Sequence, residues 1–182
     1  MSKPKLSDFK KLLANLSHEE LKDEMLKLFQ KLPQVQAFYA QELLGETDRR
    51  KILEEYKKKI YKEFWTSSGN YKNTSNSKVR TMITDFEKVC VSQSELVELI
   101  LYRVDVALHR ANEFGMSDDS EYNPALNAFE KALKIVEKER LFEYFSTECH
   151  HIARDRGNMN GWAVTQMNIF IKEHLGLNPL AR

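Results

Sequence analysis

The sequence predicts an all-α fold, a single domain of about eight or nine helices arranged in antiparallel hairpins. Across its 182 residues, apolar side chains recur at intervals of three and four, which is typical of helices with one buried face. Two stretches, Leu16–Leu21 and Val91–Leu96, each have the pattern of a capping box at a helix start. No segment alternates as a half-buried strand does, which excludes the strand-based sites of Rossmann, P-loop and hydrolase proteins.

The first third of the chain predicts three helices. The first covers Asp8 to Asn15, and the capping box at Ser17 begins a second that ends at Leu32. Pro33 ends that second helix because it cannot continue the backbone ladder. A third helix then runs to Leu44, and we expect Gly45 to be its left-handed C-terminal cap.

A fourth helix begins at Thr47 or Asp48 and ends near Trp65. The polar segment 66–77 follows, rich in residues that compete with helix formation, and we expect it to be a mobile loop. The helical spacing of apolar residues places four side chains of the fourth helix on one core-facing side: Leu53, Tyr56, Ile60 and Phe64.

The middle of the chain has the strongest helical pattern. Apolar residues keep the helical spacing from Val79 to Cys90 without a miss. The box at Ser92 then begins a long helix that ends at Phe114 before Gly115, and its broad apolar arc predicts the central helix of the fold.

The last third begins with the acidic turn 117–120. Pro124 suits the first turn of the helix that follows it. A turn at 157–161 precedes the last helix, which ends at Gly176. The three predicted helices are 125–138, 141–156 and 162–175.

The two capping boxes are 75 residues apart, which suggests a helical-repeat architecture as an alternative. Two ordinary amphipathic helices with good caps explain the same pattern more simply. A duplication would pair Leu21 with Leu96, Met25 with Ile100, and Leu26 with Leu101.

Composition indicates a cytoplasmic protein without a membrane partner. Cys90 and Cys149 are the only cysteines, too few for a disulfide framework, and are typical of reduced intracellular thiols. The longest apolar run, Leu99 to Tyr102, is far shorter than the roughly 20 residues that cross a bilayer.

Charge is distributed unevenly, although the net charge is only +1. Segment 49–80 carries ten Lys or Arg and three Glu, whereas 116–148 carries four Lys or Arg and eight acids. Opposite segments of two copies could therefore pair, so self-association is open. Cations interleaved with aromatics also suit nucleic acid, and the candidate residues are Arg49, Arg50, Lys57, Lys62, Lys72, Lys78 and Arg80.

A self-paired helix surface is the simpler interpretation of the basic segment. Acids and bases four residues apart on one helix neutralise each other, which predicts about half of these charges to be paired locally. The expected pairs are Arg50 with Glu54, Glu54 with Lys58, and Glu55 with Lys59.

A polar stripe follows the predicted central helix and comprises Glu98, Tyr102, Asp105, His109 and Asn112. Asp105 lies one turn before His109, an arrangement in which a carboxylate orients a histidine for acid–base chemistry. The stripe lies opposite the apolar arc, so a solvated face is the simpler interpretation.

Glu148 and His151 form a Glu-x-x-His pair, the spacing found in di-iron helical bundles. Such a site needs the motif twice with two further carboxylates, and this chain has it once. Zinc held by Cys90, Cys149 and a histidine lacks a paired ligand spacing. We therefore expect no metal and no cofactor.

Six short packing and turn stretches carry a resemblance: 10–13, 83–86, 112–115, 122–123, 129–134 and 161–162. On these stretches the chain resembles, over nearly its whole length, a small family of all-helical bacterial proteins of unknown function. The family has no established activity, so the resemblance implies the fold and no mechanism. Family members are more basic just before Val79, where this chain has Asn73 and Ser75, so the resemblance gives no support to anion binding there.

These patterns favour a non-catalytic helical scaffold that binds a protein or peptide partner in a groove between hairpins. Nucleic-acid binding by segment 49–80 is the alternative. A metal-dependent or acid–base enzyme comes third, because every catalytic signature is absent or incomplete.

Overall fold

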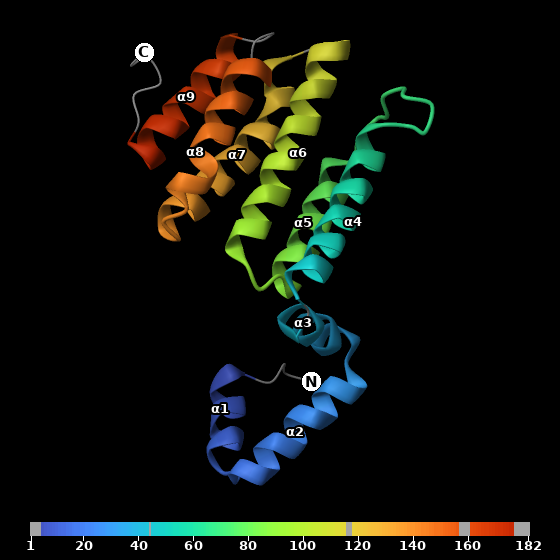
Figure 1. The fold of residues 1–182 in the computed structure, drawn as a ribbon, viewed down its shortest axis with the longest axis vertical. Helices are drawn as coiled ribbons and strands as arrows, with labels where there is room; N and C mark the ends of the chain where they lie inside the picture. The colour runs from blue at the N-terminus through green and yellow to red at the C-terminus, as the bar shows by residue number, and fades with distance from the viewer. Residues whose placement is uncertain (1–4, 44, 116–117, 157–160, 177–182) are drawn as a thin grey trace.

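The computed structural model describes residues 5–43, 45–115, 118–156 and 161–176, and it is helical throughout these ranges apart from short connections (Figure 1). The predicted turn at 157–161 lies mostly outside them. A 3₁₀ turn (Asp119–Tyr122) precedes α7, and a π-helical turn (Ile152–Arg156) extends α8. The helices are α1 (Leu6–Ala14), α2 (His18–Lys31), α3 (Pro33–Leu43), α4 (Glu46–Phe64), α5 (Asn76–Val89), α6 (Gln93–Phe114), α7 (Asn123–Lys138), α8 (Phe142–His151) and α9 (Gly161–Leu175). The all-α prediction is confirmed.

Helix α6 is the central helix of the body formed by α4–α9. It packs against α4 and α5 on one side and against α7 on the other (Figure 1). Twelve of its residues are buried, which matches the broad apolar arc predicted from the sequence. Gly115 ends the helix with a positive φ of 74°, a conformation that glycine adopts without a steric penalty.

The C-terminal helices complete the core. Helix α7 lies between α6 and α9, and Pro124 occupies its first turn as expected. Phe129 and Leu133 of α7 and Cys149 of α8 are fully buried. No described helix combines the length and the apolar character needed to cross a membrane.

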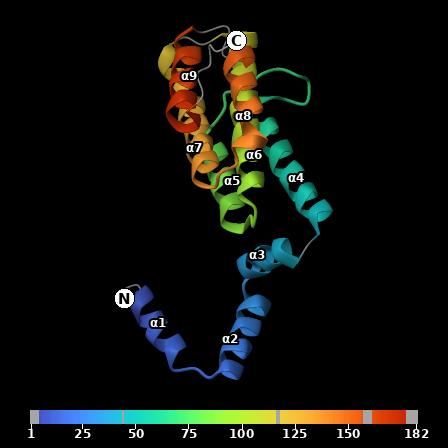
Figure 2. The same cartoon turned by 60° about the vertical axis from the view of Figure 1, so that its left-hand side comes forward.

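Helices α1–α3 form an arm outside this body (Figures 1 and 2). Every buried apolar residue in the described chain lies at Leu53 or later, and α1 and α2 bury none. The two helices suggested as a duplication therefore differ in environment. Met25 and Leu26 are 43% and 52% exposed, whereas Ile100 and Leu101 are 1% and 0% exposed.

The two predicted capping boxes have different outcomes. At Ser17 the box forms: the hydroxyl accepts the Glu20 N–H at 3.3 Å, and the Ser17 N–H donates to Glu20 Oε2 at 2.8 Å. That backbone hydrogen bond lowers the pKa of Glu20. At Ser92 the prediction is wrong, because its hydroxyl pairs with Ser94 at 2.7 Å and Glu95 accepts a hydrogen bond from Arg49 instead.

Gly45 also differs from the prediction. Its φ of −64° and ψ of 163° are extended, so it is not a left-handed cap for α3. Helix α4 begins directly at Glu46, earlier than expected, and Gly45 therefore takes the extended conformation of an N-cap residue.

The polar loop is shorter and more hydrogen-bonded than its composition suggests. Trp65 and Tyr71 form an isolated antiparallel bridge, and the Thr66 N–H donates to the Asn70 carbonyl at 2.7 Å. Gly69 turns the chain with a φ of 79°, and α5 already begins at Asn76. The mobility predicted for this loop stays a prediction.

Candidate functional site

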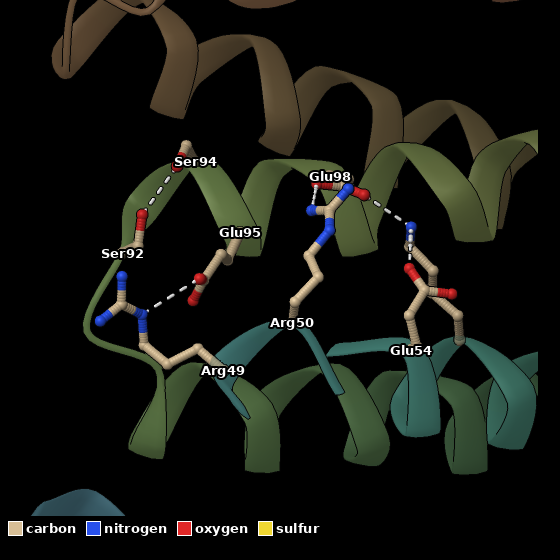
Figure 3. Close-up of polar contacts among 8 residues, drawn as sticks. Arg49, Arg50, Glu54, Ser92, Ser94, Glu95 and Glu98 are labelled. Carbon is tan, nitrogen blue, oxygen red and sulfur yellow. Dashed lines mark hydrogen bonds and ion pairs between the residues drawn. The ribbon is translucent and has the colours of Figure 1, made fainter. Parts of the chain in front are cut away.

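The basic residues at the start of α4 face acids on α6 (Figure 3). Arg50 donates a hydrogen bond to Glu98 Oε2, and Lys57 Nζ lies 2.6 Å from Glu98 Oε1. One turn earlier on α6, Glu95 Oε1 accepts from Arg49 Nε at 3.3 Å. Three of the seven predicted nucleic-acid contacts therefore lie in the α4–α6 interface.

The environment keeps this group ionised. Burial alone would raise the pKa of Glu98, but hydrogen bonds from Arg50 and Lys57 lower it overall. Burial alone would likewise lower the pKa of Lys57, whereas hydrogen bonds to Glu98 and Glu54 raise it overall. The charges are thus neutralised within the fold and hold α4 against α6.

The i, i+4 pairs expected within α4 do not account for this neutralisation. Arg50 donates its hydrogen bond to Glu98 on α6 rather than to Glu54. Lys59 Nζ lies 4.7 Å from the centroid of the Tyr56 ring. Glu98 attracts both cations because it is half-buried, and a charge pair is stronger where water is partly excluded. The expectation of local pairing was therefore wrong at Arg50.

The other predicted basic contacts are more dispersed. Lys72 Nζ donates to the backbone carbonyl of Lys62 at 2.6 Å, and the Lys62 and Lys78 side chains are exposed. Arg80 lines a different hollow, which α5 forms with α6 and α7. The structure thus divides the seven residues between an internal ion-pair group and separate surface positions.

A cleft of about 480 Å³ lies where α4, α6 and α8 meet. It brings Tyr102 and Asp105 of the polar stripe beside Glu148 and His151, which the sequence did not connect to the stripe. Tyr102 and Asp105 are partly exposed and line this cleft, so the solvated face predicted for the stripe stays an interpretation. The residues that line the cleft are Arg50, Lys57, Glu98, Tyr102, Asp105, Phe145, Glu148, His151 and Ile152.

Glu98 of the stripe also lines the cleft, whereas the other two stripe residues do not. His109 packs its ring against Trp65, with centroids 5.4 Å apart, and it is absent from the lining of the cleft, as is Asn112. His109 therefore lies outside the lining of this cleft, and the pairing of Asp105 with His109 stays a prediction.

Glu148 is the most unusual acid in the cleft. Burial raises its pKa, and the negative charges of Glu98 and Asp105 raise it further. A carboxyl group of this kind keeps its proton to higher pH and is able to donate it. In the described part of the chain, no three His, Cys, Asp or Glu side chains gather as a metal site would require, so Glu148 and His151 find no third ligand.

The arm carries a different kind of surface. Its exposed apolar residues follow helical spacing on α1 and α2, and Phe29, Phe38 and Tyr39 form an aromatic cluster between α2 and α3. The sequence pattern identifies these positions as apolar but does not indicate that they are exposed in the described structure. They are Leu6, Phe9, Leu12, Met25, Leu26, Phe29, Leu32, Phe38 and Leu43.

Comparison with known proteins identifies a family and no function. A sequence profile of the family of unknown function DUF6155 matches residues 1–173, so the chain belongs to that family. No curated protein and no solved structure matches the chain.

Proposed function

We propose that this DUF6155 family member is a non-catalytic cytoplasmic scaffold whose arm, α1–α3, binds an amphipathic helix of a partner protein. The observation that carries the proposal is the exposure of nine large apolar side chains in the arm, where α1 and α2 bury no residue. Large exposed apolar surfaces are uncommon on monomeric proteins and are typical of interaction sites.

The arrangement of the arm favours a helical occupant. Met25 and Phe29 on α2 and Leu32 at its C-cap recur at intervals of four and three. On α1, Leu6, Phe9 and Leu12 recur at intervals of three. Helix-in-groove recognition uses apolar anchors with this spacing. The Phe29, Phe38 and Tyr39 cluster supplies aromatic anchors of the kind that dominate interface energetics.

Charged residues on the arm provide a polar rim for the same surface. Glu19, Glu20, Asp23 and Glu24 begin α2, whereas Lys27 and Lys31 lie in its second half. A partner helix running antiparallel to α2, with an acidic start and a basic end of its own, would complement both halves. Rim charges of this kind set orientation more than affinity.

The nucleic-acid alternative has less support. Arg49, Arg50 and Lys57 already pair with carboxylates on α6, so phosphate binding would have to break internal ion pairs. Acid–base catalysis remains the third candidate, and the raised pKa of Glu148 beside His151 is the observation that favours it.

A crosslinked pull-down from the native host tests the proposal. Wild type is compared with Leu26→Asp on the arm and with Ile169→Asp on α9, where the control side chain is similarly exposed. We expect wild type and Ile169→Asp to capture the same protein partner, with or without nuclease treatment. Leu26→Asp should fail to capture it. The same partner is then purified and its binding to the arm is measured directly.

Other outcomes assign the chain differently. Capture that nuclease abolishes would favour nucleic acid. A dimer in light scattering that Leu26→Asp dissociates would assign the arm to a second copy. Equal capture by both variants would overturn the proposed role of the arm.

A further inference from the structure

A second hollow, of about 320 Å³, lies between α5, α6 and α7, apart from both the arm and the cleft. Among the residues that the structure describes, no acidic side chain lines it. Its polar lining is formed by Asn76, Arg80, Thr84, Arg103, Asn127 and Lys131.

Arg103 forms the inner wall of this hollow. It is 4% exposed, and its guanidinium donates to two neutral acceptors, the Pro124 carbonyl and Asn76 Oδ1. Burial and then the positive charge of Arg80 lower the pKa of Arg103 to about 10. A buried cation beside a like charge is costly unless an anion accompanies it.

The other described charged residues that line this hollow are cations, whereas Glu121 lies with Arg103 in the lining of an adjoining hollow. Arg80 makes no ion pair with any described residue. Lys131 lies 2.6 Å from Glu87 Oε2, but both partners of that pair are over a third exposed at the rim. Helices α5 and α7 also begin beside the hollow, at Asn76 and Asn123, and the N-terminus of a helix attracts anions.

The size and lining of the hollow indicate the kind of anion. Ile83 and Ile100 contribute apolar surface next to the guanidinium groups. Since one water takes up roughly 30 Å³ of liquid volume, the hollow has room for more than an inorganic ion. Arginine pairs favour planar or tetrahedral oxyanions, and a phosphate monoester carries close to two negative charges at neutral pH.

We propose that the hollow between α5, α6 and α7 binds the phosphate group of a small organic molecule, held by Arg103 and Arg80. Arg103 contacts the phosphate from the inner wall, Arg80 closes over it from the rim, and the isoleucines contact the organic part.

Titration calorimetry of the full chain tests this site with glycerol 3-phosphate, inorganic phosphate and glycerol. We expect the two phosphates to bind and glycerol not to bind. Arg80→Ala should weaken phosphate binding at least about tenfold, since it removes a charge-assisted hydrogen bond. Lys134→Ala, which removes an exposed cation from α7 outside the lining, should leave the Kd unchanged.

A purely structural role of Arg103, as a link between Asn76 and Pro124, predicts a different result. In that case neither phosphate would bind the wild type up to about 10 mM, or both would bind Arg80→Ala equally well. Either result would overturn the site. Arg80 is exposed, so circular dichroism should show that Arg80→Ala keeps the wild-type fold and that any loss of binding is local.

Discussion

Lys57 Nζ lies 2.6 Å from Glu98 Oε1, across the interface between α4 and α6. The same carboxylate accepts from Arg50 through its other oxygen, so one acid holds two cations of α4. The Lys57 and Glu98 side chains are 14% and 22% exposed, which places the pair between a surface ion pair and a buried one. Removing the acid alone leaves two cations without this partner.

Glu98→Gln should therefore destabilise the fold. We expect the free energy of unfolding to fall by about 1–2 kcal/mol. This is less than the loss of a fully buried charged hydrogen bond would cost, because water partly screens the pair. Urea denaturation followed by circular dichroism measures the change. Glu24→Gln, which breaks the exposed pair with Lys27, should have little effect. Equal effects of the two variants would contradict a special role for Glu98.

Glu148 predicts a pH dependence of the opposite sign to that of an ordinary ion-paired acid. Its pKa is raised in the fold, so its contribution to stability is complete below the unfolded pKa and is lost as pH rises through the folded value. Glu148→Gln does not undergo this loss. The difference in Tm between Glu148→Gln and wild type should therefore grow in favour of the variant from pH 4 to pH 7. Glu143→Gln, exposed on the same helix, should show no such trend.

Local patterns predicted the helices well because helical periodicity and end signals depend on nearby residues. Three signals that act within one helical turn are confirmed. The Ser17 box begins α2, Pro33 follows the end of α2, and Gly115 ends α6 with a positive φ. The Ser92 box fails because Glu95 finds a charged partner in Arg49, 46 residues away in the sequence. No local pattern contains that contact.

The candidate sites were less predictable for the same reason. Tyr102 and Glu148 line one cleft because the π-helical turn that extends α8 contacts α6, so neither motif alone predicts the cleft. Periodicity also identifies an apolar face without saying what covers it. Met25 and Ile100 occupy equivalent positions after the predicted capping boxes at Ser17 and Ser92. Met25 is nevertheless exposed, whereas Ile100 lies in the core.

The two cysteines should be unreactive in the folded protein. Burial raises the pKa of Cys90 to about 11 and that of Cys149 to about 12. At pH 8 only about one Cys90 thiol in a thousand is then a thiolate, the form that reacts. Iodoacetamide labelling followed by mass spectrometry should show little modification in buffer and complete modification in urea. Rapid labelling of Cys149 in buffer would mean that α8 opens readily.

The arm and the body should differ in their dependence on each other. All buried apolar residues of the described chain lie at Leu53 or later, so a chain of residues 45–182 retains the entire core. We expect it to unfold cooperatively with a Tm close to that of the full chain, since the main contact between the described arm and the body is that of α3 with α5. Calorimetry of both chains measures this.

The matching fragment, residues 1–44, provides the reciprocal test. Chains of about 40 residues or fewer rarely fold without a staple or a partner, and α1 and α2 bury no residue of their own. The fragment should therefore show weak helicity by circular dichroism, which increases when its partner is added. Strong helicity of the isolated fragment as a monomer would contradict this, because the arm would then be stable without any cover on its apolar surface.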